Sequence, residues 1–348
     1  MKLSEFDVQV PKEQIALYPV PERDSSRLLV ANRKTMEIEH RTFRDIVEYF
    51  EEGDVLIMND SKVFPAKMYG LKEKTGARIE VFLLRELNRD SHLWDVVVDP
   101  ARKIRVGNKL FFGNNELTAE VVDNTTSRGR MIRFLFDGKD DQFYQTLDRL
   151  GEMPIPRYLD RPSEYADRQY YQSIFATYKG SVAAPDASFH FTKEILYRLE
   201  LQGVEHCFVT LHTGLGSFRD VEVEDLSKHK MDSEQFEVKQ KTVRLVNEAK
   251  TNKKKVCAVG ATVMRALESA VTASKQLKAA RGWTEKFIFP EYQFNIANTF
   301  LTNFQPPKST MMMMKASFMD FDFMVKIYEE AAQHNYRFYC YGDSMLIL

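Results

Sequence analysis

The chain has 348 residues, of which 44% are hydrophobic and 28% are charged, and its formal net charge is −1. This balance is typical of a folded globular protein and excludes an intrinsically disordered chain. It also excludes a uniformly basic nucleic-acid binder, so any contact with nucleic acid must come from a local group of basic residues.

Targeting and redox features point to one compartment. The stretch MKLSEFDVQV contains Glu5 and Asp7 and has no apolar run, so no signal peptide is visible. No apolar run reaches the length that a bilayer span needs. The cysteines Cys207, Cys257 and Cys340 are widely spaced and form no CxxC motif, which argues against a zinc site. We therefore expect a cytoplasmic protein with reduced thiols, no membrane partner and no metal.

The first 136 residues contain two different patterns. RLLVANR (27–33) and DVLIMND (54–60) predict strands, and TFRDIVEYF (42–50) between them predicts a short helix. Short strand patterns then follow at tight intervals, with no helix of normal length between them. They cover residues 66–70, 77–84, 93–98, 103–112, 118–122 and 131–136. This spacing predicts a small antiparallel barrel or sandwich.

From Asp140 onward, helix and strand patterns alternate. Thr192 and Ser309 are the expected N-caps of two helices, and a third helix is expected to start at Thr262. Strands separated by helices imply a mainly parallel or mixed sheet with helices on both faces. We therefore expect an α/β fold with flanking helices, formed by residues 1–60 and 140–348. An inserted small antiparallel β-barrel domain would interrupt it over residues 61–139.

The stretch GSVAAPDASFHF (180–191) combines a histidine with small residues that let a ligand approach the backbone. His190 lies just before the expected helix start, where an imidazole stays neutral and anions bind. It is a candidate general acid or base, although a lone histidine is as often fixed in a loop by backbone contacts. Asp186, four residues earlier, and the small Ser188 favour the functional interpretation.

A second histidine, His212, ends the strand pattern VEHCFVTLH and is followed by the turn TGLGS (213–217). Ligands of α/β sheets bind at the carboxyl ends of strands. Thr213, Gly214 and Gly216 could hold a carboxylate, a ribose or a phosphate there. The signal is weak, because ordinary tight turns use glycine as well.

Further polar residues follow later strand patterns. Thr262 and Arg265 open a helix after the glycine of VGAT, where they would suit an anionic group, or Thr262 acts only as a cap. Asn303, Gln305 and Asp343 stand among apolar segments and need partners if buried. They are ligand contacts or loop anchors.

The inserted block carries many basic residues. Gathered on one face they would bind phosphates, whereas alternation around a barrel would scatter them as solvated charge. The candidates for a nucleic-acid contact are Lys62, Lys67, Arg78, Arg102, Arg105, Arg128 and Arg130.

Taken together, the motifs resemble those of the S-adenosylmethionine:tRNA ribosyltransferase-isomerase family of queuosine biosynthesis. The matching stretches follow the family's order over nearly the whole chain. They are LYPVPERDSSRLLV, GDVLIMNDSKVFPAKMYG, GEMPIPRYL, YQSIFATYKGSVAAP, HFT, TLHTGLGSF, KHKMDSE, CAVGATVMRALES, FIFP, LTNF, PKST and FYCYGDSMLIL. The resemblance implies an α/β domain interrupted by a β-barrel, in agreement with the pattern of elements.

The resemblance also implies a reaction. The family uses S-adenosylmethionine as a substrate, with no further cofactor, and transfers its ribosyl part to the aminomethyl group of a 7-deazaguanine. That base lies at the wobble position in the anticodon loop of tRNA. The ribosyl part is isomerised to an epoxycyclopentanediol, and adenine and methionine are released. The chemistry starts with removal of a proton from the carbon beside the sulfonium, which needs a general base.

This resemblance assigns roles to the candidates. Asp186 and His190 would transfer protons, and His212 would bind near the ribosyl group. The barrel's basic residues would contact tRNA phosphates. The residues expected to bind S-adenosylmethionine are Ser188, Thr213, Gly214, Gly216, Thr262, Arg265, Asn303 and Asp343.

The chain also departs from the family's motifs. It has DASFHF where the family reads TAGLHF, Gln305 where the family has histidine, and Lys315 in a segment that is usually apolar. Because Asp186 and Ser188 are among the departures, a catalytically weakened or silent tRNA-binding relative is the alternative. A different S-adenosylmethionine-cleaving or nucleoside-processing enzyme on the same fold is a third hypothesis.

Overall fold

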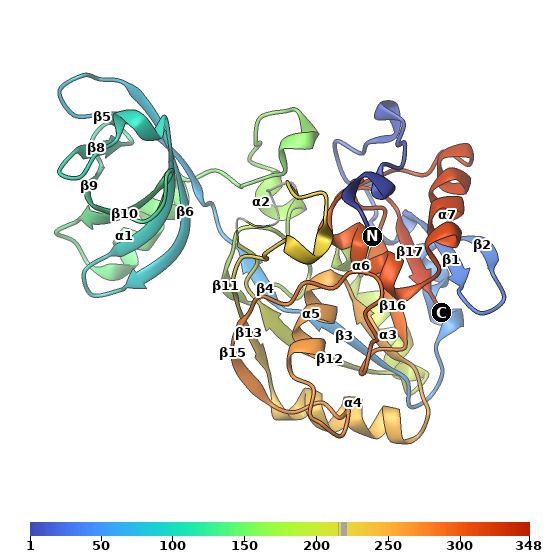
Figure 1. Cartoon of the computed structure of the whole chain (residues 1–348). Coiled ribbons are helices and arrows are strands. Elements are labelled where there is room, and N and C mark those ends of the chain that lie inside the picture. The colour runs from blue at the N-terminus through green and yellow to red at the C-terminus, as the bar shows by residue number, and fades with distance from the viewer. Residues whose placement is uncertain (215, 217–220) are drawn as a thin grey trace. The chain divides into compact units, whose positions relative to one another are not determined.

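The computed structural model describes residues 1–214, 216 and 221–348 (Figure 1). The chain divides into two compact units. The first comprises Met1–Lys62, Arg157–Arg161 and Tyr171–Leu348, and the second comprises Val63–Pro156 and Pro162–Tyr170. Of the helices in the described ranges, none is both long and apolar enough to cross a lipid bilayer.

The first unit contains a mixed sheet, which within the described residues has nine strands in the order β15-β13-β12-β3-β14-β16-β17-β1-β2. Its strands are β1 (Arg27–Asn32), β2 (Glu37–Thr42), β3 (Val55–Asn59), β12 (Glu205–Leu211), β13 (Glu234–Val238), β14 (Val256–Val259), β15 (Ala280–Thr284), β16 (Thr299–Asn303) and β17 (Ser344–Ile347). The four strands β12, β3, β14 and β16 are mutually parallel, whereas β16 and β17 are antiparallel. The predicted α/β fold with a mixed sheet is confirmed.

Helices cover both faces of this sheet (Figure 1). They are α3 (Lys193–Leu201), α4 (Gln240–Thr251), α5 (Ala261–Ser269), α6 (Thr310–Phe318) and α7 (Phe321–Gln333). In β3, Val55 and Ile57 pack into the core under α4 to α7, while Leu56 and Met58 pack into the core under α3. Burial on both faces explains the continuous apolar run that predicted this strand.

Two of the three predicted helix starts are confirmed, and the third differs by one residue. The Thr192 hydroxyl accepts a hydrogen bond from the Ile195 amide, and Ser309 caps α6 in the same way. By contrast, α5 does not start at Thr262. It begins at Ala261, one residue earlier, directly after Gly260, whose φ of +89° only glycine takes readily.

Short elements connect these layers. The segment predicted as a short helix over 42–50 is a 3₁₀ helix, η4 (Phe43–Tyr49). The other short helices are η1 (Leu3–Phe6), η2 (Lys12–Gln14), η3 (Arg23–Ser25), η5 (Ala101–Lys103), η6 (Arg157–Leu159), η7 (Asp186–Ser188) and η9 (Leu226–Lys228). Strands β4 (Ser61–Val63) and β11 (Tyr178–Ser181) form a separate two-stranded sheet.

The second unit contains a closed antiparallel barrel in the order β10-β7-β6-β5-β8-β9. Its elements are β5 (Lys67–Lys72), β6 (Arg78–Asn88), β7 (Leu93–Asp99), β8 (Lys109–Phe112), β9 (Leu117–Asn124), β10 (Gly129–Leu135), α1 (Asp140–Leu150) and α2 (Asp167–Tyr170). The unit extends beyond the expected block of 61–139. The reason is that Phe143 of α1 stacks on His92 at 3.9 Å and packs on Phe134 at 5.4 Å, so this helix belongs with the barrel.

Candidate functional site

The expected site residues gather at one edge of the nine-stranded sheet. His212 follows β12, Gly260 follows β14 and Asn303 ends β16, and these parallel strands end at the same edge. Asp343 precedes β17, which is antiparallel to β16, and Asn303 pairs with Ser344. Segments that are far apart in the sequence therefore meet at this edge, as ligand-binding segments do in α/β sheets.

Asn59, at the end of β3, connects two of these segments, the end of β12 and the start of α5. Its side-chain nitrogen donates to the Leu211 carbonyl at 3.0 Å and to the Thr262 hydroxyl at 3.1 Å. Its side-chain oxygen accepts from the amides of Leu211 and Ser61, both at 3.1 Å. We had not singled out Asn59 in the sequence. The available signal was a polar residue at the end of the buried strand DVLIMND.

The start of α5 lies beside η7. A Cβ added at Gly260 would be 3.6 Å from the Cβ of Ala187, in ordinary van der Waals contact. The N-cap residue of α5, Gly260, has no side chain to cap the first amides, and the Thr262 hydroxyl accepts from Asn59. The N-terminus of α5 therefore lies beside the segment that carries Asp186 and Ser188, and helix N-termini favour anions.

Three expected site residues carry buried polar atoms without a hydrogen-bond partner among the described residues. They are Ser188 Oγ, His212 Nδ1 and Thr213 Oγ1. Ser188 is fully buried and Thr213 is 5% exposed. Buried polar atoms are nearly always paired in folded proteins, so these three atoms need partners that the described residues do not supply. Burial lowers the pKa of His212, which is therefore neutral at pH 7.

The His212 ring lies against the backbone of Gly180. A Cβ added there would be 2.8 Å from Nδ1, and the φ of Gly180 is +147°. A side chain at position 180 would therefore push the imidazole out of its place. Gly180, the first residue of the expected site segment 180–191, therefore leaves the space that the His212 ring occupies.

Asp186 is the carboxylate of the candidate site. Its Oδ1 accepts from the Ala187 amide at 2.9 Å, and its Oδ2 accepts from the Gln305 side-chain nitrogen at 2.7 Å. Burial raises the pKa of Asp186 to about 6, against the opposing effect of the Gln305 hydrogen bond. A carboxylate with this pKa is mostly ionised at pH 7 and is a stronger base than an exposed aspartate.

His190 has protein partners on both ring nitrogens. Nε2 is 2.9 Å from the Asn303 side-chain oxygen, and Nδ1 is 2.7 Å from the Ser26 hydroxyl. The Asn303 amide nitrogen donates to the carbonyls of Tyr339 and Cys340, so its oxygen accepts from Nε2. Burial lowers the pKa of His190 to about 4. Its contacts support a positioning role rather than proton transfer, and its expected catalytic role stays a prediction.

Arg265 is paired with Glu234 of β13, and both side chains are at least nine-tenths buried. The other oxygen of Glu234 accepts from the Gly214 amide at 2.7 Å, and the Arg265 Nε donates to the Lys286 carbonyl at 3.0 Å. The pair thus holds the turn after His212 against α5. Sequence reasoning missed Glu234, because nothing in its stretch KHKMDSE showed which cation it would meet.

Asp343 is an anchor for two loops. Its two oxygens accept from the amides of Arg27 at 2.9 Å and Arg337 at 2.8 Å, and burial raises its pKa. The backbone therefore already uses the carboxylate that we expected to contact a ligand. Gly216 lies near Asp232, whereas Ser217 falls outside the described residues.

The basic residues of the inserted block divide into two groups. Arg130 is 7% exposed, and it donates to the carbonyls of Ala101, Ile104 and Gly129, so it fixes the barrel instead of facing a nucleic acid. We correct this expectation: a guanidinium saturated by backbone carbonyls is not available to phosphates. The remaining candidates are exposed or half-buried; they are Lys62, Lys67, Arg78, Arg102, Arg105 and Arg128. Lys67 pairs with Glu80 at 3.4 Å, and Arg128 pairs with Asp99 at 3.4 Å.

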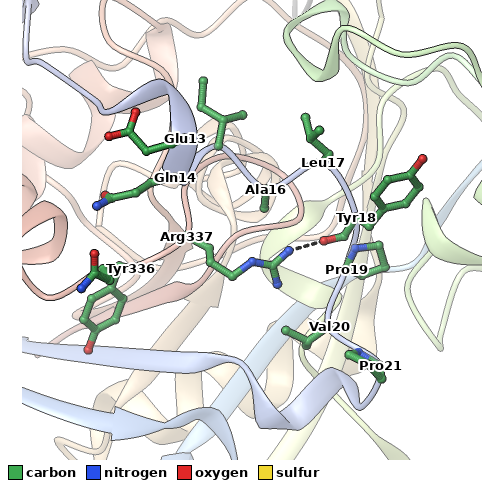
Figure 2. Close-up of a pocket in the computed structure, with 12 residues that line it drawn as sticks. Glu13, Gln14, Ala16, Leu17, Tyr18, Pro19, Val20, Pro21, Tyr336 and Arg337 are labelled. Atoms are coloured by element: carbon green, nitrogen blue, oxygen red, sulfur yellow. Dashed lines mark hydrogen bonds between the residues drawn. The ribbon is translucent and has the colours of Figure 1, made fainter.

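A surface pocket of about 750 Å³ lies elsewhere in the first unit (Figure 2). It is lined by residues 13–21 and 335–337, and the Arg337 guanidinium donates to the Tyr18 carbonyl across it. None of the expected site residues lines this pocket, so it lies apart from the unpaired polar atoms described above.

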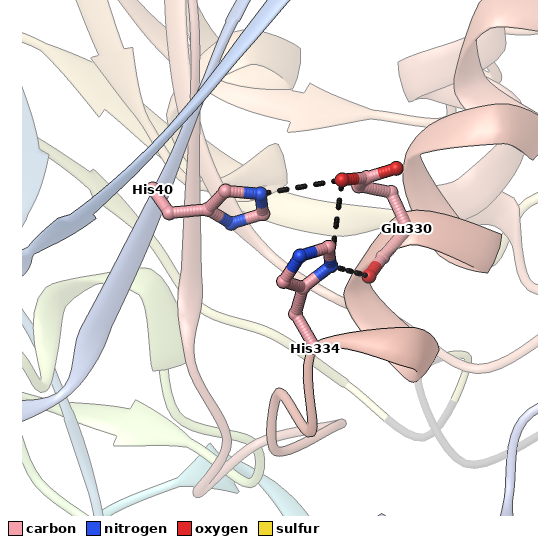
Figure 3. A group of neighbouring side chains, drawn as sticks. All are labelled: His40, Glu330 and His334. Carbon is pink, nitrogen blue, oxygen red and sulfur yellow. Dashed lines mark hydrogen bonds and ion pairs between the residues drawn. The ribbon is translucent and has the colours of Figure 1, made fainter.

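His40, Glu330 and His334 offer possible metal-ligand atoms within 4.8 Å of one another (Figure 3). Each has a protein partner, however. His40 Nδ1 is 2.9 Å from the Tyr336 hydroxyl, and His334 Nδ1 is 2.9 Å from the Glu330 carbonyl oxygen, to which it must donate. A nitrogen that carries a proton is not a metal ligand. His334 Nδ1 is therefore not a ligand atom in this structure, and His40 Nε2 lies 3.4 Å from the Glu330 carboxylate.

Comparisons with known proteins agree on one family. Residues 3–347 match the family model described as "Queuosine biosynthesis protein". Curated relatives named S-adenosylmethionine:tRNA ribosyltransferase-isomerase include one from Cytophaga hutchinsonii, 58% identical, with both chains fully covered. Another, from Bacteroides fragilis, is 56% identical over the whole of this chain and 99% of its own.

A solved structure supports the same assignment. The S-adenosylmethionine tRNA ribosyltransferase of Thermotoga maritima is 32% identical to this chain, with a TM-score of 0.56. The similarity covers 99% of this chain and all of the other. Because the family model, the relatives and this structure all match nearly end to end, the chain belongs to the family of queuosine biosynthesis proteins whose curated members are named S-adenosylmethionine:tRNA ribosyltransferase-isomerase.

Proposed function

We propose that this chain transfers the ribosyl group of S-adenosylmethionine to 7-aminomethyl-7-deazaguanine at the wobble position of tRNA. The group is isomerised to the epoxycyclopentanediol of epoxyqueuosine, and adenine and methionine leave. The observation that carries the proposal is the set of buried, unpaired polar atoms on Ser188, His212 and Thr213, together with the carboxylate of Asp186, which shares η7 with Ser188. Full-length relatives with this activity in their names support it.

Asp186 is the general base in this proposal. It accepts the proton from the carbon beside the sulfonium and becomes a neutral carboxyl, which can then protonate the departing adenine. Its pKa of about 6 suits both directions of transfer near pH 7. Its negative charge also attracts the positive sulfonium.

The unpaired atoms and the α5 terminus bind the rest of the substrate. The hydroxyls of Ser188 and Thr213 and the neutral imidazole of His212 hydrogen-bond the ribosyl oxygens. The first amides of α5 receive the methionine carboxylate. The role of Arg265 in binding the substrate is only indirect, because its positive charge is already balanced by Glu234.

The tRNA substrate needs a basic surface, since phosphate contacts supply most of its affinity. The exposed residues Arg78, Arg102 and Arg105 of the barrel unit are our candidates for this contact. The target amine lies outside the ring of an unpaired anticodon base, so no base pair has to be opened. A tRNA substrate also places the protein in the cytoplasm.

The test is adenine release. The protein is incubated with S-adenosylmethionine and tRNA that carries 7-aminomethyl-7-deazaguanine, and free adenine is measured by chromatography. The matched control is the same tRNA with guanine at the wobble position. Adenine that forms only with the modified tRNA, and is lost in Asp186→Asn, is the expected result.

Two other results would contradict the proposal. If tRNA is retained on a filter but no adenine forms, the chain is the catalytically silent tRNA-binding relative. If adenine forms equally without modified tRNA, the chain is a different S-adenosylmethionine-cleaving enzyme.

A further inference from the structure

Lys315 of α6 is fully buried in the first unit. Its ammonium group donates to the Asn303 carbonyl at 3.0 Å and to the Tyr328 hydroxyl. Both acceptors are neutral, and among the described residues no carboxylate lies within ion-pair distance of Nζ. A buried ammonium without a counter-charge is strongly unfavourable, so burial favours the neutral amine unless a more distant negative charge opposes it.

A chain of hydrogen bonds leads from Lys315 to Asp186. The Tyr328 hydroxyl accepts from Lys315 and donates to the Gln305 carbonyl at 2.9 Å. The side chain of the same Gln305 donates to Asp186 Oδ2 at 2.7 Å. Asp186, Gln305 and Lys315 were noted separately as departures from the family's motifs, and in the structure they form one connected group.

The charges around Asp186 single out this lysine. Among the described residues, Tyr158, Tyr171 and Cys340 also interact electrostatically with the Asp186 carboxylate. Burial raises the pKa of all three, so they are neutral at pH 7 and supply no positive charge. Lys315 is a cation that favours the ionised form of Asp186, in addition to the hydrogen bonds from Gln305 and the Ala187 amide.

The influence is mutual. Burial lowers the pKa of Lys315 to about 7, and the negative charge of Asp186 opposes this decrease. Each group therefore favours the charged form of the other, as coupled titrating sites do. The second neighbour of Lys315, Tyr328, has a pKa raised by burial and stays neutral.

We propose that Lys315 is the counter-charge of Asp186, and thereby a positioning residue for the proton transfer assigned to Asp186. The inference rests on the proposed function for its role in the reaction. Lys315 does not touch the substrate and exchanges no proton in the step. Its positive charge favours the ionised Asp186 carboxylate before the substrate proton is taken up, and Gln305 and Tyr328 connect the two groups.

The direct test is a titration of Asp186 that requires no turnover. The Asp186 carboxyl carbon is followed by NMR in aspartate-labelled protein, with Asp186→Asn identifying the signal. Lys315→Met should raise the Asp186 titration midpoint by at least one pH unit. The matched control, Lys326→Met, changes an exposed lysine on the neighbouring helix α7 and should leave the midpoint unchanged. An unchanged midpoint in folded Lys315→Met would overturn the proposal.

The reciprocal measurement covers the case in which Lys315→Met does not fold. In Asp186→Asn, the signal of the Lys315 carbon next to Nζ should titrate at least one pH unit lower than in the unaltered protein. Absence of this shift would also overturn the pairing.

The pH dependence of activity distinguishes this inference from the proposed function. The acid limb of adenine release should move to higher pH in Lys315→Met, because Asp186 is then ionised only at higher pH. A purely structural lysine would lower the unfolding temperature and leave the limb in place, which would contradict the inference. If the unaltered protein releases no adenine, the proposed function fails, while the two NMR titrations still decide the pairing.

Discussion

The buried ion pair between Glu234 and Arg265 gives the sharpest stability prediction. Glu234→Ala removes the counter-charge of a guanidinium whose side chain is 8% exposed, and it also removes the acceptor of the Gly214 amide. Removing one partner of a buried pair costs about 3–5 kcal/mol, since the other charge is left uncompensated. For a domain of this size, about 1 kcal/mol corresponds to roughly 2–4 °C, so the melting temperature should fall by about 6–20 °C.

Tryptophan fluorescence can isolate the relevant unit. The chain has two tryptophans, Trp94 in the barrel unit and Trp283 on β15 of the sheet unit. In a Trp94→Phe background, the remaining signal comes from the residue that pairs with Gln235, next to Glu234. Thermal unfolding followed in this way reports on the sheet unit alone.

The matched control is Glu22→Ala. Glu22 pairs with Arg44 on the surface, where its side chain is 73% exposed, so its loss should leave the midpoint nearly unchanged. Replacing Glu234 and Arg265 together by leucine and methionine should recover part of the loss, because no charge then remains buried. If Glu234→Ala lowers the midpoint no more than Glu22→Ala does, the reasoning about this pair is refuted.

Three further predictions follow from the same contacts. The pKa of His190 is lowered from 6.5 to about 4, so about 3 kcal/mol of stability should be present above pH 6.5 and lost as the pH falls to 4. Acid unfolding curves of His190→Gln should lack this pH-dependent loss of stability. Curves identical to those of the unaltered protein would contradict the prediction. His212→Ala should weaken S-adenosylmethionine binding in calorimetry about tenfold, with an unchanged melting temperature, because Nδ1 has no protein partner. Arg130→Ala should lower the melting temperature of the barrel, whereas Arg102→Ala should weaken only tRNA retention; the reverse pattern would refute our division of the basic residues.

Much of the fold followed from local sequence signals. Helix caps at Thr192 and Ser309 were predictable because the capping side chain and its amide lie within three residues of each other. The barrel was predictable because its strands are joined by short turns with few residues between them. The predicted start of α5 was one residue too late, because the local pattern favoured Thr262 as the first helical residue. In the structure the Thr262 hydroxyl accepts a hydrogen bond from Asn59, which is distant in the sequence.

The location of the site on the sheet was predictable from the sequence, but its side-chain contacts were not. Residues at strand ends identified the correct sheet edge, since parallel strands share their carboxyl ends. Whether a polar side chain there faces a ligand or the protein depends on partners that are mostly more than 100 residues away. Asp343 is occupied by amides from Arg27 and Arg337, and His190 by Ser26 and Asn303. No spacing rule predicts such pairings from the sequence.

The division of the chain limits how the barrel can be exchanged between relatives. Residues 157–161 belong to the sheet unit, although residues on both sides of them belong to the barrel unit. Within the sheet unit, Tyr158 packs on Tyr339 at 4.8 Å, and Arg161 donates to the Leu17 carbonyl at 3.1 Å. A chimera that swaps the continuous block 63–170 would replace these contacts as well. A graft that preserves the sheet unit has to carry 63–156 and 162–170 as two pieces around the native five-residue segment.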